Sequence, residues 1–130
     1  MKRDFLRAKI HGATVTEANL EYIGSLTLDR NLMDAADLHP FEKIEVYNIT
    51  GGQRFSTYVI EGRRGSGQLC VNGAAAHLAR PGDSVIIAAY CQLHEEEIAT
   101  FTPRLVFVDA ENRQVALEEF RPHTETVNTP

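Results

Sequence analysis

The sequence predicts a mainly β domain, folded as a closed barrel or a sandwich. Short runs rich in Val, Ile, Tyr, Phe and Thr recur at roughly regular spacing along the 130 residues. Turn-forming Gly, Pro, Asn and Asp residues bound most of these runs, while helical signals are weak and short. The length suits one domain, and 43% hydrophobic residues are enough to build a core. We therefore expect a single domain over residues 1–120.

The β prediction rests on eight segments that alternate or are continuously apolar. These expected strands are Phe5–His11, Ser25–Leu28, Ile44–Asn48, Arg54–Ile60, Gln68–Val71, Val85–Cys91, Arg104–Val108 and Gln114–Glu118. Gly51-Gly52 predicts a hairpin turn, and Arg80-Pro81-Gly82-Asp83 predicts a second tight turn. Ser84–Ala89 is nearly continuously apolar, which is typical of a strand covered on both sides.

Three short helical segments complete the predicted elements. Asp29 can cap a helix over Arg30–Ala36, and Asn72 can cap one over Gly73–Leu78. A third helical turn is expected within Glu95–Thr100. Arg121–Pro130 is polar and aperiodic, which predicts a mobile tail.

Charge and composition exclude several kinds of partner, location and metal site. Thirteen Lys and Arg against 18 Asp and Glu give a net charge of −5, which argues against a nucleic-acid or anionic-membrane partner. No apolar run is long enough to span a bilayer, and the first residues lack the apolar segment of a signal peptide, so we expect a cytoplasmic protein. Cys70 and Cys91 lie in apolar stretches and fit no zinc or redox motif, which predicts two buried free thiols. The five histidines are scattered, so no metal site is expected.

Gly24-Ser25 is a candidate site with two interpretations. As a local feature it is a turn that leads into a strand, and the same dipeptide recurs at Gly65-Ser66. A strained, self-cleaving peptide would also need a serine after glycine. A hydroxyl held against the preceding carbonyl can attack it if the backbone is bent and the oxyanion receives a donor.

Three other segments carry polar groups in patterns that suit either structure or chemistry. Strict alternation places Arg54 and Tyr58 on one face of their strand and Thr57 on the other, as in any half-exposed strand. Lys9 and His11, two residues apart, project together from the first strand. The amides of Asn72-Gly73-Ala74-Ala75 could receive a carboxylate, although helix-start packing is the better explanation of this segment taken alone.

Four short segments, taken together and in order, indicate a protein family far more specifically than any one of them does alone. In order they read YIGS at 22–25, RFSTY at 54–58, VNGAAAH at 71–77 and GDSVIIA at 82–88. This set resembles the pyruvoyl-dependent aspartate 1-decarboxylase family at the family's spacing, over about Lys2 to Pro103. The resemblance implies a double-psi β-barrel, a homotetramer with active sites at subunit interfaces, and the conversion of L-aspartate to β-alanine and CO2 for pantothenate and coenzyme A synthesis.

The resemblance also implies that the chain cuts itself between Gly24 and Ser25. The Ser25 hydroxyl would attack the Gly24 carbonyl to give an ester, and elimination and hydrolysis would then leave a pyruvoyl group with loss of ammonia. The products would be a β chain, residues 1–24, and an α chain, residues 25–130. A Schiff base between the substrate amine and the pyruvoyl group would serve as the electron sink, without pyridoxal phosphate or a metal. Whether a maturation factor assists the cleavage stays open.

The same resemblance implies a role for particular residues of this chain. Tyr58 would donate the proton to the carbanion, Arg54 would hold a substrate carboxylate, and Lys9 would add positive charge near the anionic substrate. Thr57 would contact the Gly24 carbonyl during cleavage and the substrate afterwards. The amides of Gly73, Ala74 and Ala75 would bind substrate further, and the supporting positions are His11, Tyr22 and Asn72.

One conflict arises between strand geometry and these roles. Thr57 and Tyr58 face opposite ways on a regular strand, yet the family places both in one site. Either a local irregularity turns one of them, or they serve sites formed with different subunits, which is the hypothesis we prefer. The alternative to a decarboxylase is a non-catalytic, unprocessed β-barrel binding or assembly module. A serine hydrolase that pairs Ser25 with His11 has little support, because the spacing suggests no acidic partner.

Overall fold

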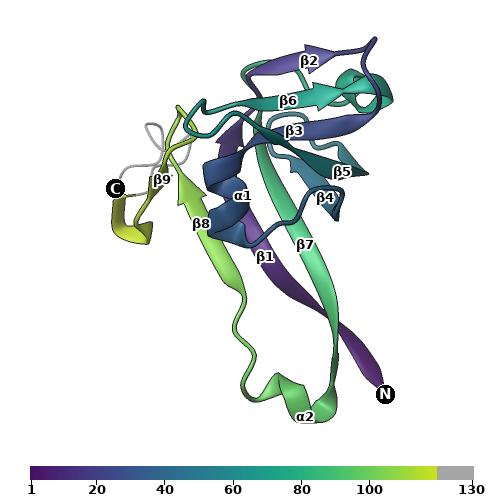
Figure 1. Ribbon diagram of the computed structural model, residues 1–130, viewed down its shortest axis with the longest axis vertical. Coiled ribbons are helices and arrows are strands. Elements are labelled where there is room, and N and C mark those ends of the chain that lie inside the picture. Colours follow the sequence, from purple (N-terminus) through teal and green to yellow (C-terminus); the bar gives the residue numbers. More distant parts are fainter. Residues whose placement is uncertain (120–130) are drawn as a thin grey trace.

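The computed structural model describes residues 1–119, which form a nine-stranded sheet wrapped into a barrel with a projecting arm (Figure 1). The order of strands across the sheet is β2-β6-β3-β5-β4-β7-β1-β8-β9. The strands are β1 (Lys2–Thr14), β2 (Glu17–Asn19), β3 (Ser25–Asp29), β4 (Lys43–Asn48), β5 (Arg54–Gly62), β6 (Leu69–Asn72), β7 (Ser84–His94), β8 (Arg104–Val108) and β9 (Gln114–Val115). The helices are α1 (Arg30–Ala36), α2 (Glu95–Ile98) and two short 3-10 helices, η1 (Gly73–His77) and η2 (Leu117–Glu119).

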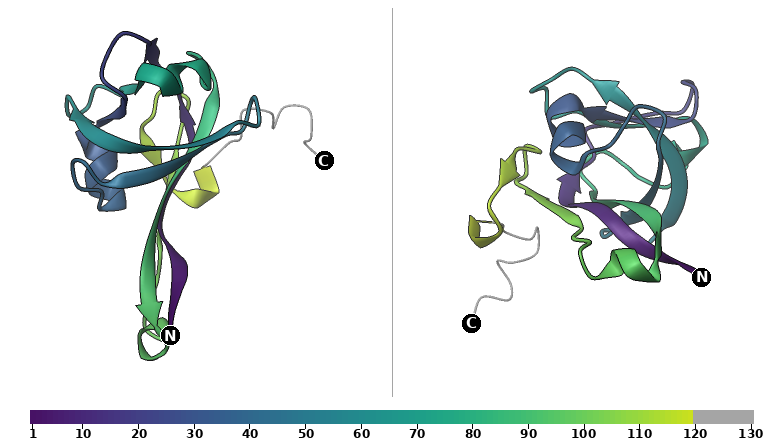
Figure 2. Two further views of the ribbon diagram at one scale, coloured as in Figure 1. Left: turned by 90° about the vertical axis from the view of Figure 1, so that its right-hand side faces the viewer. Right: turned by 60° about the horizontal axis from the view of Figure 1, so that its bottom comes forward.

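The predicted strands are confirmed, with three differences that have physical causes. β1 and β7 are longer than expected because they pair with each other beyond the barrel, from Lys2 opposite His94 onward, and form the arm that carries α2 (Figure 2). β2 was not predicted, because its three residues are all exposed and show no apolar pattern. The last expected strand is shorter, since the chain turns into η2 after Val115.

Both predicted turns are confirmed by their hydrogen bonds. At Gly51-Gly52 the chain reverses between the antiparallel strands β4 and β5, and the Gly52 amide donates to the Asn48 carbonyl at 2.7 Å. In the second turn the Asp83 amide donates to the Arg80 carbonyl at 3.0 Å.

The helix predictions are confirmed for α1 and corrected for η1. Asp29 caps α1, because its Oδ1 accepts from the Asn31 amide at 2.8 Å. Asn72 precedes η1, yet its side chain makes no cap hydrogen bond to that helix. The Asn72 amide is used elsewhere, across the sheet toward β3.

The core fills the barrel with aliphatic side chains from both ends of the sequence. It includes Ile10, Leu26, Val59 and Ile87, each no more than 1% exposed. β7 lies between β1 and β4 near the centre of the sheet, and all residues of Ser84–Ala89 except the half-buried Ile86 are buried, as expected. Both cysteines are free thiols, but only Cys70 is buried; Cys91 is half-buried because it lies on the arm.

Within residues 1–119, no helix is long and apolar enough to cross a membrane, and no cluster of His, Cys, Asp and Glu could hold a metal ion. The expected mobile tail, Arg121–Pro130, lies outside the described residues.

Asp29 ties three segments together through its carboxylate, which is 1% exposed. Oδ1 accepts from the amides of Asn31 and Gly65, and Oδ2 accepts from the amide of Gly67. Burial by itself raises the pKa of this carboxyl. The three amide donors and the charge of Arg113 outweigh burial, so the pKa lies below its usual value.

Because the pKa of Asp29 is lower in the folded state, part of the free energy of unfolding depends on pH. The contribution of Asp29 is complete above the ordinary pKa of an aspartate and is lost as pH falls through the lower pKa of the folded state. We expect Asp29→Asn to lower the free energy of unfolding at pH 7 by about 2 kcal/mol, because an amide NH2 would then face a backbone N–H. Urea unfolding at pH 7 and pH 3 should show a weaker acid dependence for the variant. Equal acid dependence of the two proteins would contradict this role.

Candidate active site

Ser25 is the first residue of β3, and its side chain is held on two sides. The residue is 1% exposed, whereas the preceding Gly24 is exposed. The Ser25 hydroxyl donates to the Ile23 carbonyl at 3.1 Å and accepts from Asn72 Nδ2 at 3.0 Å. Asn72 is in place because β3 and β6 are antiparallel and pair Ser25 with Asn72. The arrangement fixes a nucleophilic oxygen directly after an accessible peptide bond.

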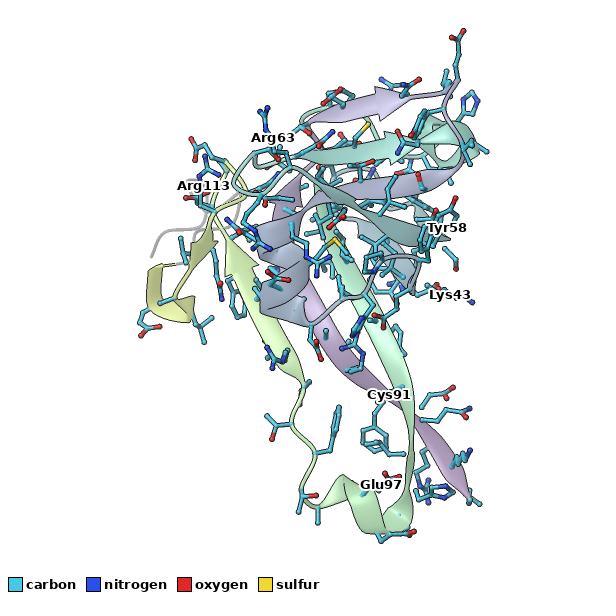
Figure 3. The ribbon with its side chains drawn as sticks, in the orientation of Figure 1. Lys43, Tyr58, Arg63, Cys91, Glu97 and Arg113 are labelled. Carbon is cyan, nitrogen blue, oxygen red and sulfur yellow. The ribbon has the colours of Figure 1, made fainter. Side chains whose placement is uncertain are left out.

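Tyr58 lies beside Ser25 on the other neighbouring strand. β3 and β5 are parallel, and Leu26 pairs with Val59, so the preceding residues of the two strands are neighbours. Leu26 and Val59 both point into the core, so strand alternation turns Ser25 and Tyr58 to the opposite face. Figure 3 shows Tyr58 at the edge of the molecule with Lys43, its partner across β4 and β5.

Gly73 closes the site from the side of η1. Its φ is +70°, and a Cβ at this position would lie 2.6 Å from the Gly24 Cα and 3.1 Å from the Tyr22 carbonyl oxygen. Only glycine therefore lets η1 approach the segment that ends at Gly24. Gly24 itself has no positive φ, and a Cβ there would meet no atom within 4 Å. The tight fit is at Gly73, and the backbone strain that the Gly-Ser dipeptide suggests is not seen at Gly24.

Lys9 and His11 on β1 form a second group with Arg54 at the start of β5. Register aligns His11, Ile86, Tyr47 and Arg54 across β1, β7, β4 and β5, and Lys9 lies two residues before His11 on the same face. The Arg54 guanidinium stacks on the Tyr47 ring, 4.4 Å from its centre. Arg54 lies four residues before Tyr58 on β5, about 13 Å along the strand. Within one chain this cationic group is therefore separate from Ser25.

The charge of the second group comes from Lys9 and Arg54. Burial first, and then the neighbouring Lys9, lowers the pKa of His11, which favours a neutral imidazole at pH 7. The Tyr47 hydroxyl lies 2.7 Å from the Tyr90 hydroxyl. Burial and this hydrogen bond raise the pKa of Tyr47 to about 12, so the ring under Arg54 stays neutral.

Comparison with known proteins gives the family of this chain. The sequence model described as aspartate decarboxylase matches residues 1–115. This chain belongs to the aspartate decarboxylase family. Three relatives named aspartate 1-decarboxylase are similar over most of their length. The relative from Caldicellulosiruptor bescii is 53% identical over 95% of this chain and 97% of its own. That from Ralstonia pickettii is 50% identical over 92% and 99%, and that from Myxococcus xanthus is 53% identical over 88% and 88%.

Family membership confirms the fold expected from the resemblance. Aspartate decarboxylases are double-psi β-barrels, and the mainly β barrel of this chain agrees with that fold. The parallel pairing of β3 with β5, within a largely antiparallel sheet, is what places Ser25 next to Tyr58.

The structure distributes the predicted site residues into two groups. One group surrounds the Gly24–Ser25 bond and comprises Tyr22, Gly24, Ser25, Tyr58, Asn72, Gly73, Ala74 and Ala75. The other comprises Lys9, His11 and Arg54. Thr57 faces the side of the core residue Val59, opposite Tyr58, because β5 pairs with β4 from Arg54 to Tyr58 without a register shift. The local irregularity that could have turned Thr57 is therefore excluded.

The hydrolase alternative does not match this arrangement. The Ser25 hydroxyl hydrogen goes to the Ile23 carbonyl, whereas the His11 ring packs against Phe107, with the ring centres 5.8 Å apart.

Thr27 and Cys70, which no motif singled out, also belong to the site. Both contact the Asn72 side-chain amide. Thr27 lies two residues after Ser25, and Cys70 lies two residues before Asn72. Residues two apart on a strand share a face, so Thr27 lies on the face of Ser25 and Cys70 on the face of Asn72. This spacing is the sequence signal that could have identified them.

Gly73 offers a test of the close approach between η1 and Gly24. We expect Gly73→Ala to fold less stably and to lose cleavage at Gly24, because the new Cβ must displace the Gly24 backbone. Gly82→Ala is the matched control, since Gly82 also has a positive φ of +93° but open space around it. The control should lose only about 1 kcal/mol of stability and still be cut. Gel electrophoresis measures the cleavage. Normal cleavage of the Gly73 variant would show that the close contact between Gly73 and Gly24 has no role.

Proposed function

We propose that this chain is an aspartate 1-decarboxylase that converts L-aspartate to β-alanine and CO2 with a pyruvoyl group made from its own Ser25. The observation that carries the proposal is the buried Ser25 hydroxyl, which Ile23 and Asn72 hold directly after the exposed Gly24. The supporting finding is about 50–55% identity to relatives of this name over most of the chain.

Self-cleavage needs a positioned hydroxyl and room to move at the peptide before it. Asn72 and the Ile23 carbonyl position the hydroxyl, and Gly24, which is exposed and carries no side chain, leaves its own peptide free of side-chain obstruction. The hydroxyl oxygen would add to the Gly24 carbonyl carbon, and the bond to the Ser25 nitrogen would break. The position fits the group that results, because a new chain beginning at residue 25 stays paired with β5 and β6.

When present, the pyruvoyl group supplies an electron sink for the charge left by loss of CO2. The chain's own residues bind the substrate and move a proton. Arg54 and Lys9 would bind the carboxylates of L-aspartate, and Arg54 is oriented for this by the ring of Tyr47. Tyr58, beside Ser25 by register, would donate the proton that replaces CO2. The first amides of η1, from Gly73 to Ala75, lack helical acceptors and would bind the substrate further.

A complete site would then need two copies of the chain. Lys9 and Arg54 lie apart from Ser25 within one chain, and Arg54 begins β5 four residues before Tyr58. Large apolar side chains near Ser25 are also exposed, including Tyr22 at 54%, Ile23 at 75% and Phe41 at 76%. Exposed apolar surface of this kind favours coverage by another protein surface. A homotetramer in which a neighbour covers these residues would supply the missing cations.

The cytoplasm is the compartment we propose for this activity. Cys70 and Cys91 are both free thiols, which suits a reducing compartment.

The intact mass of the purified protein, before and after warming, tests the proposal. We expect two fragments, residues 1–24 and 25–130, with the larger one lighter by one ammonia than a chain that begins with serine. Such a preparation should release β-alanine from L-aspartate. A chain that stays whole after warming and after addition of a cell lysate would refute self-processing and favour the non-catalytic barrel module.

Mixed oligomers test whether the site is shared. Ser25→Ala and Arg54→Ala chains should each be inactive alone. Co-expressed, they should regain about a quarter of the sites, because a random neighbour pair then combines an intact Ser25 with an intact Arg54 one time in four. Decarboxylation assays on tagged mixed oligomers measure this. Mixtures as inactive as the parents would place both residues in a site of one chain.

A further inference from the structure

The Asn72 side-chain amide is held by two residues besides Ser25. Its Nδ2 donates to Ser25 Oγ and to Thr27 Oγ1, each at 3.0 Å. Its Oδ1 accepts from the Cys70 thiol, with Sγ 3.1 Å away. Thr27 and Cys70 are themselves paired across β3 and β6, two residues beyond the pair of Ser25 and Asn72. The four side chains therefore form one hydrogen-bonded cluster on a single face of two strands.

The orientation of this amide decides what the Ser25 oxygen meets. An asparagine turned by 180° about its last bond has nearly the same shape, but its oxygen and nitrogen exchange places. With Oδ1 toward Ser25, the serine hydrogen would be drawn to Asn72 and away from the Ile23 carbonyl. The observed orientation instead gives Ser25 Oγ a donor from Asn72 and leaves its own hydrogen on Ile23.

Cys70 and Thr27 favour the observed orientation for different reasons. A thiol is a weak donor and a weak acceptor, and here its hydrogen is directed at Asn72 Oδ1, so the observed orientation gives both groups a partner. Burial raises the pKa of the Cys70 thiol, which keeps its hydrogen in place. Thr27 Oγ1 accepts the second Nδ2 hydrogen, which would otherwise be left unpaired beside a buried serine.

We propose that Cys70 and Thr27 are positioning residues for self-cleavage, which together hold the Asn72 amide with its nitrogen toward Ser25. The inference rests on the proposed function. In the cleavage step a bond forms between Ser25 Oγ and the Gly24 carbonyl carbon, and the bond from that carbon to the Ser25 nitrogen breaks. The hydroxyl proton passes to that nitrogen. Neither Cys70 nor Thr27 touches these atoms; both act through Asn72.

Two pairs of variants test the proposal, each with a conservative partner. Cleavage rates of the purified full-length chain, followed by intact mass, are compared for Cys70→Ala with Cys70→Ser and for Thr27→Val with Thr27→Ser. The Ala and Val variants should each be cut about tenfold more slowly, the effect of losing one neutral hydrogen bond. The Ser variants keep a hydroxyl and should stay within about threefold of the unaltered chain. Cys91→Ala, on the arm, should leave the rate unchanged.

Rescue by serine separates positioning from packing. Equal slowing of Cys70→Ala and Cys70→Ser, or unaltered cleavage of Thr27→Val, would overturn the proposal. If the unaltered chain is not cut at all, the proposed function fails, and the amide orientation is then decided by NMR of the Asn72 NH2 group. Through-space contacts from that group to the Thr27 methyl support the amide orientation that Thr27 and Cys70 are proposed to hold. Contacts to the Cys70 β-hydrogens show the reversed amide and overturn it.

Discussion

Ser25→Ala is expected to give a folded chain that is never cut and has no decarboxylase activity. The variant keeps the backbone pairing of β3 with β5 and β6, and Asn72 Nδ2 keeps its bond to Thr27. The loss of the two hydrogen bonds of the hydroxyl, to the Ile23 carbonyl and from Asn72, should cost about 2 kcal/mol of stability. Without the hydroxyl there is no nucleophile for the Gly24 carbonyl and no atom from which to make the pyruvoyl group.

The chain contains a matched control for this variant at its second Gly-Ser dipeptide. Ser66 lies in the exposed turn between β5 and β6, where its Oγ accepts from the Gln68 amide at 3.2 Å. Ser66→Ala should be cut between Gly24 and Ser25 at the normal rate and should keep full activity. Intact mass and a β-alanine assay compare the two variants. Fragments from the Ser25 variant that end at Gly24 would mean that another group attacks this peptide.

Tyr58→Phe is expected to separate cleavage from decarboxylation. The ring stays in its place beside Phe41, where the ring centres are 6.1 Å apart, so the variant should fold and be cut normally. It lacks the hydroxyl that would protonate the carbanion, and general acid catalysis contributes about 10²- to 10⁴-fold. We therefore expect kcat to fall at least about a hundredfold, with a smaller change in KM.

Tyr90→Phe is the control for Tyr58→Phe. Among residues 1–119 the Tyr90 hydroxyl has a hydrogen bond with Tyr47 and none with Ser25 or Tyr58, so its loss should change activity by no more than a few-fold. The loss of CO2 and the yield of β-alanine are measured on fully cut preparations of both variants. Normal turnover by Tyr58→Phe would remove Tyr58 from the mechanism and would direct attention to its neighbour Lys43.

Much of the secondary structure could be predicted because it follows from local sequence. Alternating β-formers set β4, β5 and β8, and Asp29 marks the start of α1 as a cap. Predictions failed where pairing outside the segment overrides local preference. β1 and β7 run on into the arm because each supplies the other's hydrogen bonds, and Asn72 leaves η1 uncapped because its amide is used by β3.

The sequence by itself determined the family, since four segments in the right order and spacing are specific together, and with the family came the residues worth examining. Only the tertiary structure decided which of these residues meet. Strand order and register join residues far apart in the chain, and no local pattern encodes them. They bring Ser25, Tyr58 and Asn72 together, add Thr27 and Cys70, and leave Lys9 and Arg54 at a different place on the sheet.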